Sequence, residues 1–183
     1  ATRTVLDLGT GSGAIALAIK HTQPEWKVTA IDTSAEALDV ARGNASRLGL
    51  DVDFVQSAWF DALNAEHDHA RFDLTKFDLI ISNPPYIAND DPHMAALKHE
   101  PKQALTSGDE GLDDIRRIIQ DAPAFLNPDG WLLLEHGYDQ AAKVRALLKS
   151  QGFSQVRSKL DLAGIERCSG GQWLMQTLRT ENS

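Results

Sequence analysis

The chain has 183 residues, of which 42% are hydrophobic and 24% charged, a composition typical of one soluble globular domain with a substantial core. Its 18 Lys and Arg against 26 Asp and Glu give a formal net charge of −8, which argues against a broad phosphate-binding face. The single cysteine, Cys168, excludes an internal disulfide and fits a reducing compartment, so we expect a cytoplasmic protein. No apolar run approaches the length of a membrane span, and the N-terminus has no signal-peptide pattern.

The first predicted strand, Thr4–Leu8, leads directly into a glycine-rich loop that is followed by a helical pattern. The loop, Gly9–Ala14, literally satisfies the dinucleotide-binding pattern Gly-x-Gly-x-x-Ala. Glycines let a ligand approach the backbone closely, and the N-terminus of the following helix offers free N–H groups. Asp7, near the end of the strand, faces this loop and suits a ligand that carries an ammonium group.

A second predicted strand, Val28–Ile31, is followed by another acid, Asp32, which can bind both hydroxyls of a ribose. An acid here fits NAD and S-adenosylmethionine equally, so Asp7 is the residue that discriminates between them. Helix capping is the alternative role for Asp32. However, Thr33 and Glu36 form a Thr-x-x-Glu capping box for the next helix, so we expect Asp32 to be free for a ligand.

The helix after Asp32 is predicted from about residue 34 to residue 48, and Gly49 ends it. Its buried face is expected to comprise Leu38, Ala41, Ala45 and Leu48. A third strand, Val52–Val55, leads to Trp59, which either covers an adenine ring or packs in the core. Residues 64–75 are polar and favour a solvent loop, so His67 and His69 do not indicate a zinc site.

A fourth predicted strand, beginning at Phe77, stops at the motif Asn83-Pro84-Pro85-Tyr86. Consecutive prolines fix φ and remove N–H donors, so the backbone from Asn83 to Pro85 should be stiff and extended. The carbonyls of Asn83 and Pro84 then lie outside ordinary ladders, Asn83 adds an amide, and Tyr86 adds an aromatic face. This set suits a planar amino group, either a carboxamide or a nucleobase amine. A turn that merely ends a strand is the alternative, but a position one strand after a glycine-rich loop favours a functional role.

The second half of the chain continues the alternation of strands and helices. The polar stretch 87–109 is expected to contribute substrate contacts or a lid. Gly111 opens an amphipathic helix with Leu112, Ile115, Ile118 and Ile119 on one face. Asn127–Gly130 is predicted as a turn and Trp131–Glu135 as a buried strand.

Asp139 is predicted to cap the next helix, which buries Val144, Leu147 and Leu148 and ends at Gly152. Two final strands are predicted over 153–159 and 172–178, joined by a turn at Gly170-Gly171. This connection is too short for a parallel crossover, so the last strand should run antiparallel. The chain therefore predicts an α/β fold with a doubly wound, mostly parallel, seven-stranded sheet and an antiparallel last strand.

These motifs resemble those of class I, Rossmann-like, S-adenosylmethionine-dependent methyltransferases that act on a planar nitrogen. More narrowly, the chain resembles the release-factor (protein-glutamine N5) methyltransferase family over essentially its whole length. The narrower resemblance rests on residues 81–87, on residues 133–137, and on Glu100-Pro101 with Ala104-Leu105, Gly108 and Gly111-Leu112. Asn-Pro-Pro-Tyr is shared with adenine-N6 methyltransferases of nucleic acids, so the stretch that begins at Glu100 is the more selective part.

The resemblance implies one catalytic domain over 1–183, with an N-terminal substrate-recognition domain missing from this chain. It implies S-adenosyl-L-methionine as the cofactor, S-adenosyl-L-homocysteine as the product, and no metal. The implied cofactor-binding residues are Asp7, Gly9, Thr10, Gly11, Ser12, Gly13, Asp32, Trp59 and Asn83. The implied substrate-binding residues are Asn83, Pro84, Pro85 and Tyr86, of which Asn83, Pro84 and Tyr86 are catalytic.

One departure from the family concerns the adenine amino group. The family commonly has an acid where this chain has Ala58, and Asp61 is the substitute that the sequence offers. No histidine is assigned a catalytic role, because His93, His99 and His136 fit surface or structural positions better.

The implied activity is methyl transfer to the side-chain amide N5 of a glutamine, in the first place the Gly-Gly-Gln glutamine of translation peptide chain release factors. The protein is expected to be a monomer that binds neither nucleic acid nor membranes directly. An adenine-N6 methyltransferase of RNA or DNA is the main alternative, which the acidic charge disfavours. A hydride-transferring NAD enzyme and a non-catalytic cofactor-binding module are the remaining alternatives.

Overall fold

The computed structural model describes residues 1–64, 76–87 and 106–174, and these form one seven-stranded sheet with the order β3-β2-β1-β4-β5-β7-β6. The strands are β1 (Thr4–Leu8), β2 (Lys27–Asp32), β3 (Asp53–Gln56), β4 (Phe77–Ser82), β5 (Leu126–Glu135), β6 (Ser154–Leu160) and β7 (Glu166–Trp173). The helices are α1 (Ala14–Thr22), α2 (Ala35–Leu48), α3 (Asp61–Asn64), α4 (Asp113–Asp121) and α5 (Ala141–Gln151), with a 3₁₀ turn at Ala122–Phe125.

The strand directions confirm the predicted fold class. β1 to β5 pair in parallel, whereas β7 is antiparallel to both of its neighbours, β5 and β6. The fold is therefore α/β, its doubly wound sheet is mostly parallel, and the expected antiparallel last strand is present. Among the described residues, no helix is long and apolar enough to cross a membrane.

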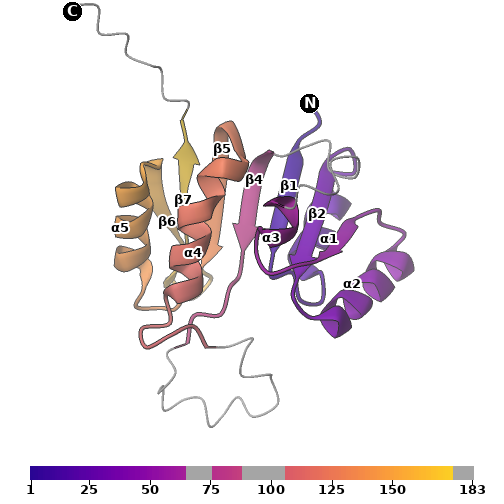
Figure 1. The fold of residues 1–183 in the computed structure, drawn as a ribbon, viewed down its shortest axis with the longest axis horizontal. Coiled ribbons are helices and arrows are strands. Elements are labelled where there is room, and N and C mark those ends of the chain that lie inside the picture. Colours follow the sequence, from indigo (N-terminus) through magenta and orange to yellow (C-terminus); the bar gives the residue numbers. More distant parts are fainter. Residues whose placement is uncertain (65–75, 88–105, 175–183) are drawn as a thin grey trace, which may run out of the picture.

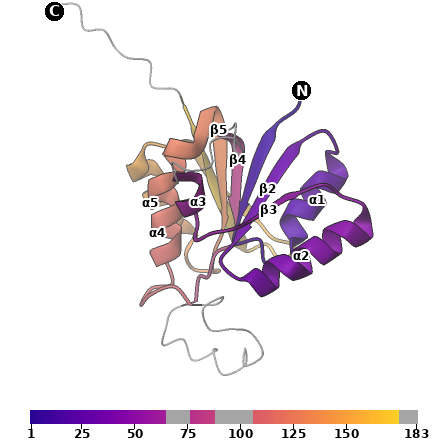
Figure 2. The ribbon, with the colours of Figure 1, turned by 45° about the vertical axis from the view of Figure 1, so that its right-hand side comes forward.

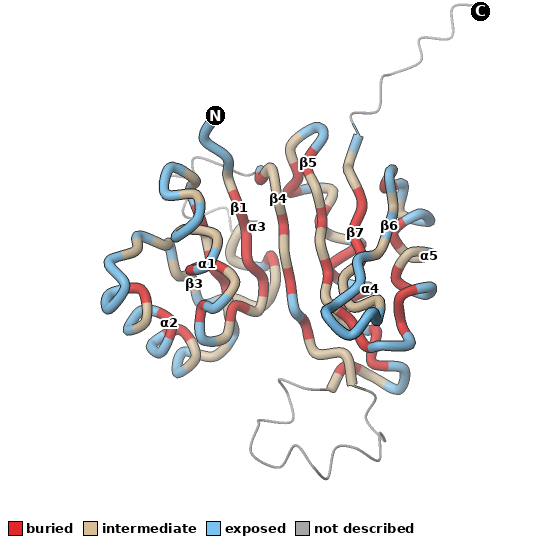
Figure 3. Tube along the Cα trace, turned by 180° about the vertical axis from the view of Figure 1, so that it is seen from behind, coloured by how far each residue is buried: buried red, intermediate tan, exposed pale blue. Residues whose placement is uncertain are grey.

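Helices cover both faces of the sheet. Figure 2 shows α4 and α5 on one side of the sheet and α1 and α2 on the other. Since side chains alternate along a strand, Leu6 and Leu8 enter the core under α4 and α5, whereas Val5 enters a smaller cluster with Ala16 of α1. The buried residues are most continuous in β1, where Val5 to Leu8 are all buried, as expected for a central parallel strand packed between helices (Figure 3).

The carboxyl ends of the parallel strands all meet at one edge of the sheet, the lower edge in Figure 1, and the N-terminus lies at the opposite edge. Leu8 of β1 is paired with Ile31 of β2 on one side and with Ser82 of β4 on the other. The residues that follow these three strands therefore leave the sheet side by side. This is the edge at which open α/β sheets bind ligands.

Two helix caps differ from the prediction. α2 is capped by Ser34, whose Oγ accepts a hydrogen bond from Ala37 N, so the predicted capping box of Thr33 and Glu36 is wrong by one residue. α5 starts after Gln140 and has no side-chain cap, so the predicted cap at Asp139 is also wrong. The error at α2 arises because the neighbouring residues Thr33 and Ser34 are both suited to the cap position.

Leu48, predicted to be buried, is 59% exposed, because the apolar face of α2 ends at Ala45, one turn before the helix does. The same helix confirms the predicted stop, since Gly49 has the left-handed conformation of a helix C-terminus, with φ 65°.

The predicted turns of the second half are strand segments in the structure. Gly170 and Gly171 lie inside β7, and the connection from β6 is formed by residues 161–165, where Asp161 Oδ1 accepts hydrogen bonds from the N–H groups of Ala163 and Ile165. β7 consequently ends at Trp173, and the rest of the predicted strand, from residue 175, lies outside the described residues.

The predicted turn at Asn127–Gly130 is an irregularity within β5. The register against β4 jumps from Phe77↔Leu126 to Leu79↔Trp131, so β5 has extra residues at this point. Asp129 there has φ 64°, a left-handed conformation that ordinary strand residues do not adopt. The turn-forming residues therefore produce a bulge within β5 and not a break between two elements.

The glycines of β7 are required by close packing, which gives a stability prediction. A Cβ atom built on Gly170 would lie 2.5 Å from the Leu132 carbonyl oxygen of β5, so Gly170→Ala should push the two strands apart. We expect a loss of about 1–3 kcal/mol in the free energy of unfolding, measured by urea denaturation. The control is Gly43→Ala on α2, where a Cβ meets nothing within 4 Å. It should stabilise the protein by roughly 0.5–1 kcal/mol, and equal effects of the two variants would contradict the packing argument.

Candidate functional site

The loop after β1 turns sharply through three glycines in the left-handed region, with φ 70° at Gly9, 56° at Gly11 and 84° at Gly13. Residues with a Cβ are strained in this conformation, which explains the glycines at these positions. The N–H groups of Gly9 and Thr10 both donate to the Ile31 carbonyl, at 2.8 and 2.9 Å, so the loop is tied to the end of β2. Gly13 is the N-cap of α1 and packs against α2, where its Cβ would lie 3.1 Å from Ala41 Cβ.

Asp7 lies beneath this loop and is 1% exposed. Its Oδ2 accepts hydrogen bonds from Thr10 Oγ1 at 2.6 Å and from Ala16 N at 3.1 Å. Its Oδ1 is buried and has no hydrogen-bond partner in the described part of the chain. Burial raises the pKa of Asp7 to about 6, against a lowering effect of its hydrogen bonds. A buried carboxylate oxygen without a partner, beside a glycine loop, suits a cationic group of a ligand.

Asp32 is not free in the way that the sequence suggested. Its Oδ2 accepts a hydrogen bond from Gly11 N at 2.8 Å, and its Oδ1 accepts one from Ser34 N at 2.9 Å. The side chain therefore holds the glycine loop against the start of α2. Asp32 is only half-buried, and each of its carboxylate oxygens can accept a further hydrogen bond. Binding of a ribose by Asp32 therefore stays a prediction.

Trp59 lies against the start of the glycine loop. A Cβ on Gly9 would be 3.6 Å from the Trp59 ring, and the half-buried indole also packs against the main core. Trp59 has φ 46°, which turns the chain sharply between β3 and α3. Next to it, the Asp61 carboxylate is already paired with Arg117 of α4 at 2.8 Å, so the substitute for an acid at Ala58 is engaged elsewhere.

The Asn83-Pro84-Pro85-Tyr86 turn follows β4 directly, next to the end of β1. The Ser82 hydroxyl donates a buried hydrogen bond of 2.7 Å to the Leu8 carbonyl, which fixes the two strand ends together. Asn83 is exposed, and its side chain makes no hydrogen bond with the described residues. Pro84 is buried, and Tyr86 is half-buried against the core. The turn thus presents one free amide beside the glycine loop.

The structure also brings forward residues that the sequence did not single out. Ser82 and Gln140 both hold the turn, through hydrogen bonds to Leu8 O and to Tyr86 O. A serine at a strand end or a glutamine at a helix start carries no periodic or motif signal, so sequence patterns do not reveal them. The segment that carries Glu100-Pro101, with His93 and His99, lies outside the described residues, as do His67 and His69.

Both ring nitrogens of His136 are hydrogen-bonded in the buried region behind the turn, to Gly137 O at 2.9 Å and to Ser169 Oγ at 2.7 Å. Burial lowers the pKa of this histidine, so it stays neutral near pH 7. These contacts fit the structural position expected for His136. Among residues 1–64, 76–87 and 106–174, no group of three or more potential metal ligands is present.

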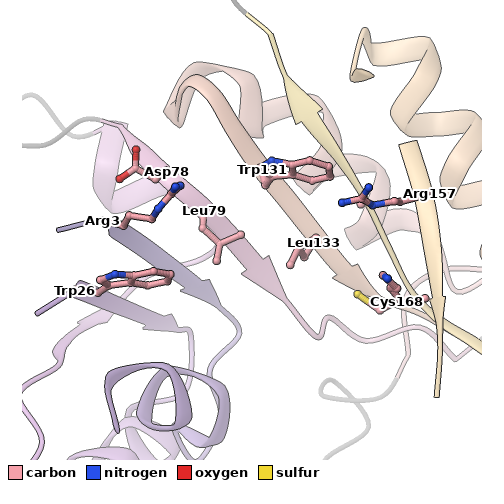
Figure 4. Close-up of a pocket in the computed structure, with 10 residues that line it drawn as sticks. Arg3, Trp26, Asp78, Leu79, Trp131, Leu133, Arg157 and Cys168 are labelled. Atoms are coloured by element: carbon pink, nitrogen blue, oxygen red, sulfur yellow. The ribbon is translucent and has the colours of Figure 1, made fainter. Parts of the chain in front are cut away.

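A separate hollow of about 340 Å³ lies on the face of the sheet beside α1 and α2, and Figure 4 shows it. Trp26, Leu79 and Trp131 contribute its apolar walls, and the Arg157 guanidinium lies 4.9 Å from the centre of the Trp131 ring. None of the predicted site residues lines this hollow. The candidate site is therefore the edge formed by the glycine loop and the Asn83–Tyr86 turn.

One known protein family matches the first part of the chain. The family described as methyltransferase small domain matches residues 1–110, which include both the glycine loop and the Asn83–Tyr86 turn. The chain belongs to this methyltransferase family. The match covers more than half of the chain and every residue of the candidate site.

Among curated proteins, this methyltransferase domain is similar to the release factor glutamine methyltransferases of Burkholderia pseudomallei, 49% identical over 92% of the chain, and of Bordetella pertussis, 50% identical over 91%. The matched region is 59% and 60% of those proteins, so the chain spans about three fifths of their length. A solved structure, the Thermus thermophilus 16S rRNA methyltransferase RsmC in complex with AdoMet and guanosine, matches 93% of the chain and 37% of that protein with a TM-score of 0.65. At 20% identity, this likeness concerns the fold.

The buried carboxylate of Asp7 predicts a pH-dependent cost in stability. Above pH 6 the folded protein holds a buried charge, and as the pH falls from about 6 to 3.8 the folded state binds a proton that the unfolded state does not. Without ligand, Asp7→Asn should therefore be more stable than the wild type at pH 8. This advantage should shrink by on the order of 3 kcal/mol by pH 4. Urea denaturation of both proteins across this range measures it, and a difference that does not change with pH would contradict the burial of the charge.

Proposed function

We propose that the protein transfers a methyl group from S-adenosylmethionine to the side-chain amide N5 of a glutamine in translation release factors. The observation that carries this proposal is the adjacency of the glycine loop to the Asn83–Tyr86 turn, which follows from the pairing of Leu8 with Ser82. A methyl donor and a planar amide can meet only where their binding groups share one edge. The names of the relatives at 49% and 50% identity support glutamine as the acceptor.

The cofactor supplies a methyl group on a sulfonium centre. Its methionine part would lie along Gly9–Gly13, where glycines without a Cβ atom let a ligand approach the backbone closely. Its ammonium would lie near Asp7, whose buried Oδ1 has no partner among the described residues and suits a cation. Asp32 would bind the ribose while it keeps the loop in place, and Trp59 would lie beside the adenine.

The acceptor amide would be held by Asn83 and by the carbonyl oxygen of Pro84, with Tyr86 packed against it. An amide nitrogen is a poor nucleophile because its lone pair is delocalised, so the residues act chiefly by alignment. Fixed orientation of two reacting groups supplies roughly 7–11 kcal/mol in well-positioned systems. Oxygen acceptors on the two N–H bonds also stabilise the positive charge that develops on nitrogen in the transition state. The proton leaves after the methyl group has been transferred.

Adenine-N6 methylation uses the same Asn-Pro-Pro-Tyr chemistry and is the second candidate. The net charge of −8 disfavours a protein that must hold a phosphate backbone. About two fifths of the length of these relatives lies outside the matched region. For glutamine methylation we propose that an additional domain, N-terminal to this chain, helps to recognise the protein substrate. A cytoplasmic monomer is part of the same proposal.

Replacing the free amide tests the assignment of the acceptor site. Asn83→Ala removes the side-chain contact to the substrate but no hydrogen bond of the described fold, so the rate of methyl transfer should fall by roughly 10²-fold or more. The affinity for S-adenosylmethionine, measured by calorimetry, should stay within about threefold of the wild type. Asn127→Ala is the control, because its amide contacts Asp78 at 3.0 Å, far from this edge. Unchanged turnover in Asn83→Ala would remove the proposed role.

The substrate class is tested by mass spectrometry of a release factor incubated with the full-length enzyme and isotope-labelled S-adenosylmethionine. The expected result is one labelled methyl group on the glutamine of the Gly-Gly-Gln sequence. RNA and DNA oligonucleotides in parallel reactions should stay unlabelled, and label on adenine would instead favour the second candidate. Titration with NADH should show no binding at concentrations that saturate the site with S-adenosylmethionine.

A further inference from the structure

One buried side chain, Gln140, connects three separate segments behind the Asn83–Tyr86 turn. It lies at the N-terminus of α5 and is 6% exposed. Its Nε2 group donates to the carbonyl of Tyr86 at 2.9 Å, of Glu110 at 3.1 Å and of Gly111 at 3.3 Å. Its Oε1 accepts from Gly137 N at 2.7 Å. The turn, the segment before α4 and the end of β5 therefore meet at one amide.

The surroundings fix the orientation of this amide. Three carbonyl oxygens face Nε2 and one N–H faces Oε1, so the reverse orientation would oppose oxygen to oxygen at three places. Gly111 confirms how closely the segments approach, since a Cβ at this position would overlap the Tyr86 carbonyl. The site is built for a side chain that donates on one end and accepts on the other.

Among the residues that the structure describes, the turn has few other hydrogen bonds. At its start, Ser82 is held by the β4 ladder and by Leu8 O. After its end, Ile87 O accepts from Ser107 N at 3.0 Å. Between them, Asn83 is exposed and without a hydrogen bond in the described part of the chain. Its position is thus set by the stiff backbone of the two prolines and by what holds each end of that backbone.

Resting on the proposed function, we propose that Gln140 is a positioning residue for the methyl acceptor. By holding the Tyr86 carbonyl it fixes the far end of the turn, and through the rigid prolines it fixes where Asn83 and the Pro84 carbonyl present the substrate amide. In this proposal Gln140 acts only through the backbone of the turn and is not in contact with substrate or cofactor. Since alignment is the main contribution of this site, a small displacement of the turn lowers the rate of transfer and leaves the cofactor loop unchanged.

The test compares Gln140→Met and Gln140→Glu with the wild type in the full-length enzyme. Methionine preserves volume but has no donor, and glutamate keeps the acceptor for Gly137 N while it turns an oxygen toward the three carbonyls. The value of kcat should fall at least tenfold in both variants, with the Kd for S-adenosylmethionine and the KM for the release factor within about threefold. The control is Gln151→Met on the same helix. It removes a hydrogen bond of 3.3 Å from the side-chain amide to Gln120 O and should leave kcat unchanged.

A second readout does not depend on the substrate. The side-chain amide signals of Asn83 in NMR spectra should shift and broaden in both Gln140 variants, and should stay unchanged in Gln151→Met. Values of kcat within twofold of the wild type together with unchanged Asn83 signals would overturn the proposal. Joint loss of kcat and cofactor binding in both variants would also overturn it, because Gln140 would then be needed only for folding. A wild type that does not methylate the release factor, with Asn83 signals still perturbed in the variants, would reject the proposed function alone.

Discussion

A single buried hydrogen bond, from the Ser82 hydroxyl to the Leu8 carbonyl at 2.7 Å, joins the ends of the two strands on which the site depends. It complements a parallel register in which Leu8 lies opposite Ser82. A slip of one residue would move every side chain of β4 to the other face of the sheet, so the apolar core enforces the register. The glycine loop after β1 and the Asn83–Tyr86 turn after β4 consequently emerge next to each other.

Two polar groups at this edge have no hydrogen-bond partner among the described residues. Within the described part of the chain, the buried Oδ1 of Asp7 has no partner, and the exposed side-chain amide of Asn83 makes no hydrogen bond. The buried carboxylate oxygen costs stability, and a core of leucine, isoleucine and phenylalanine side chains under α4 and α5 offsets that cost. The exposed Asn83 amide is solvated by water and costs the fold little. Polar groups that the fold leaves unsatisfied are those that a ligand can satisfy, which is why the family assignment and the geometry lead to the same edge.

Much of this arrangement could be predicted from the sequence, because the features concerned depend on local rules. Apolar runs gave the strands, and glycines at the ends of α2 and α5 marked where those helices stop. The failures have physical causes. At the start of α2, Thr33 and Ser34 competed for one cap, and Gly170 in β7 is a glycine because of the Leu132 carbonyl and not because of a turn. Gln140 was missed because its three carbonyl partners come together only in the folded chain.

The central claim is that a sulfonium methyl group and an amide nitrogen meet between the ends of β1 and β4. A crystal structure of the full-length protein with S-adenosylhomocysteine and a peptide containing Gly-Gly-Gln tests this claim most directly. The account predicts the sulfur atom beside the Gly9–Gly13 loop, with the glutamine amide held by Asn83 and by the carbonyl of Pro84. Cofactor bound elsewhere, such as in the hollow between Trp26 and Trp131, or a glutamine that does not contact Asn83, would contradict it.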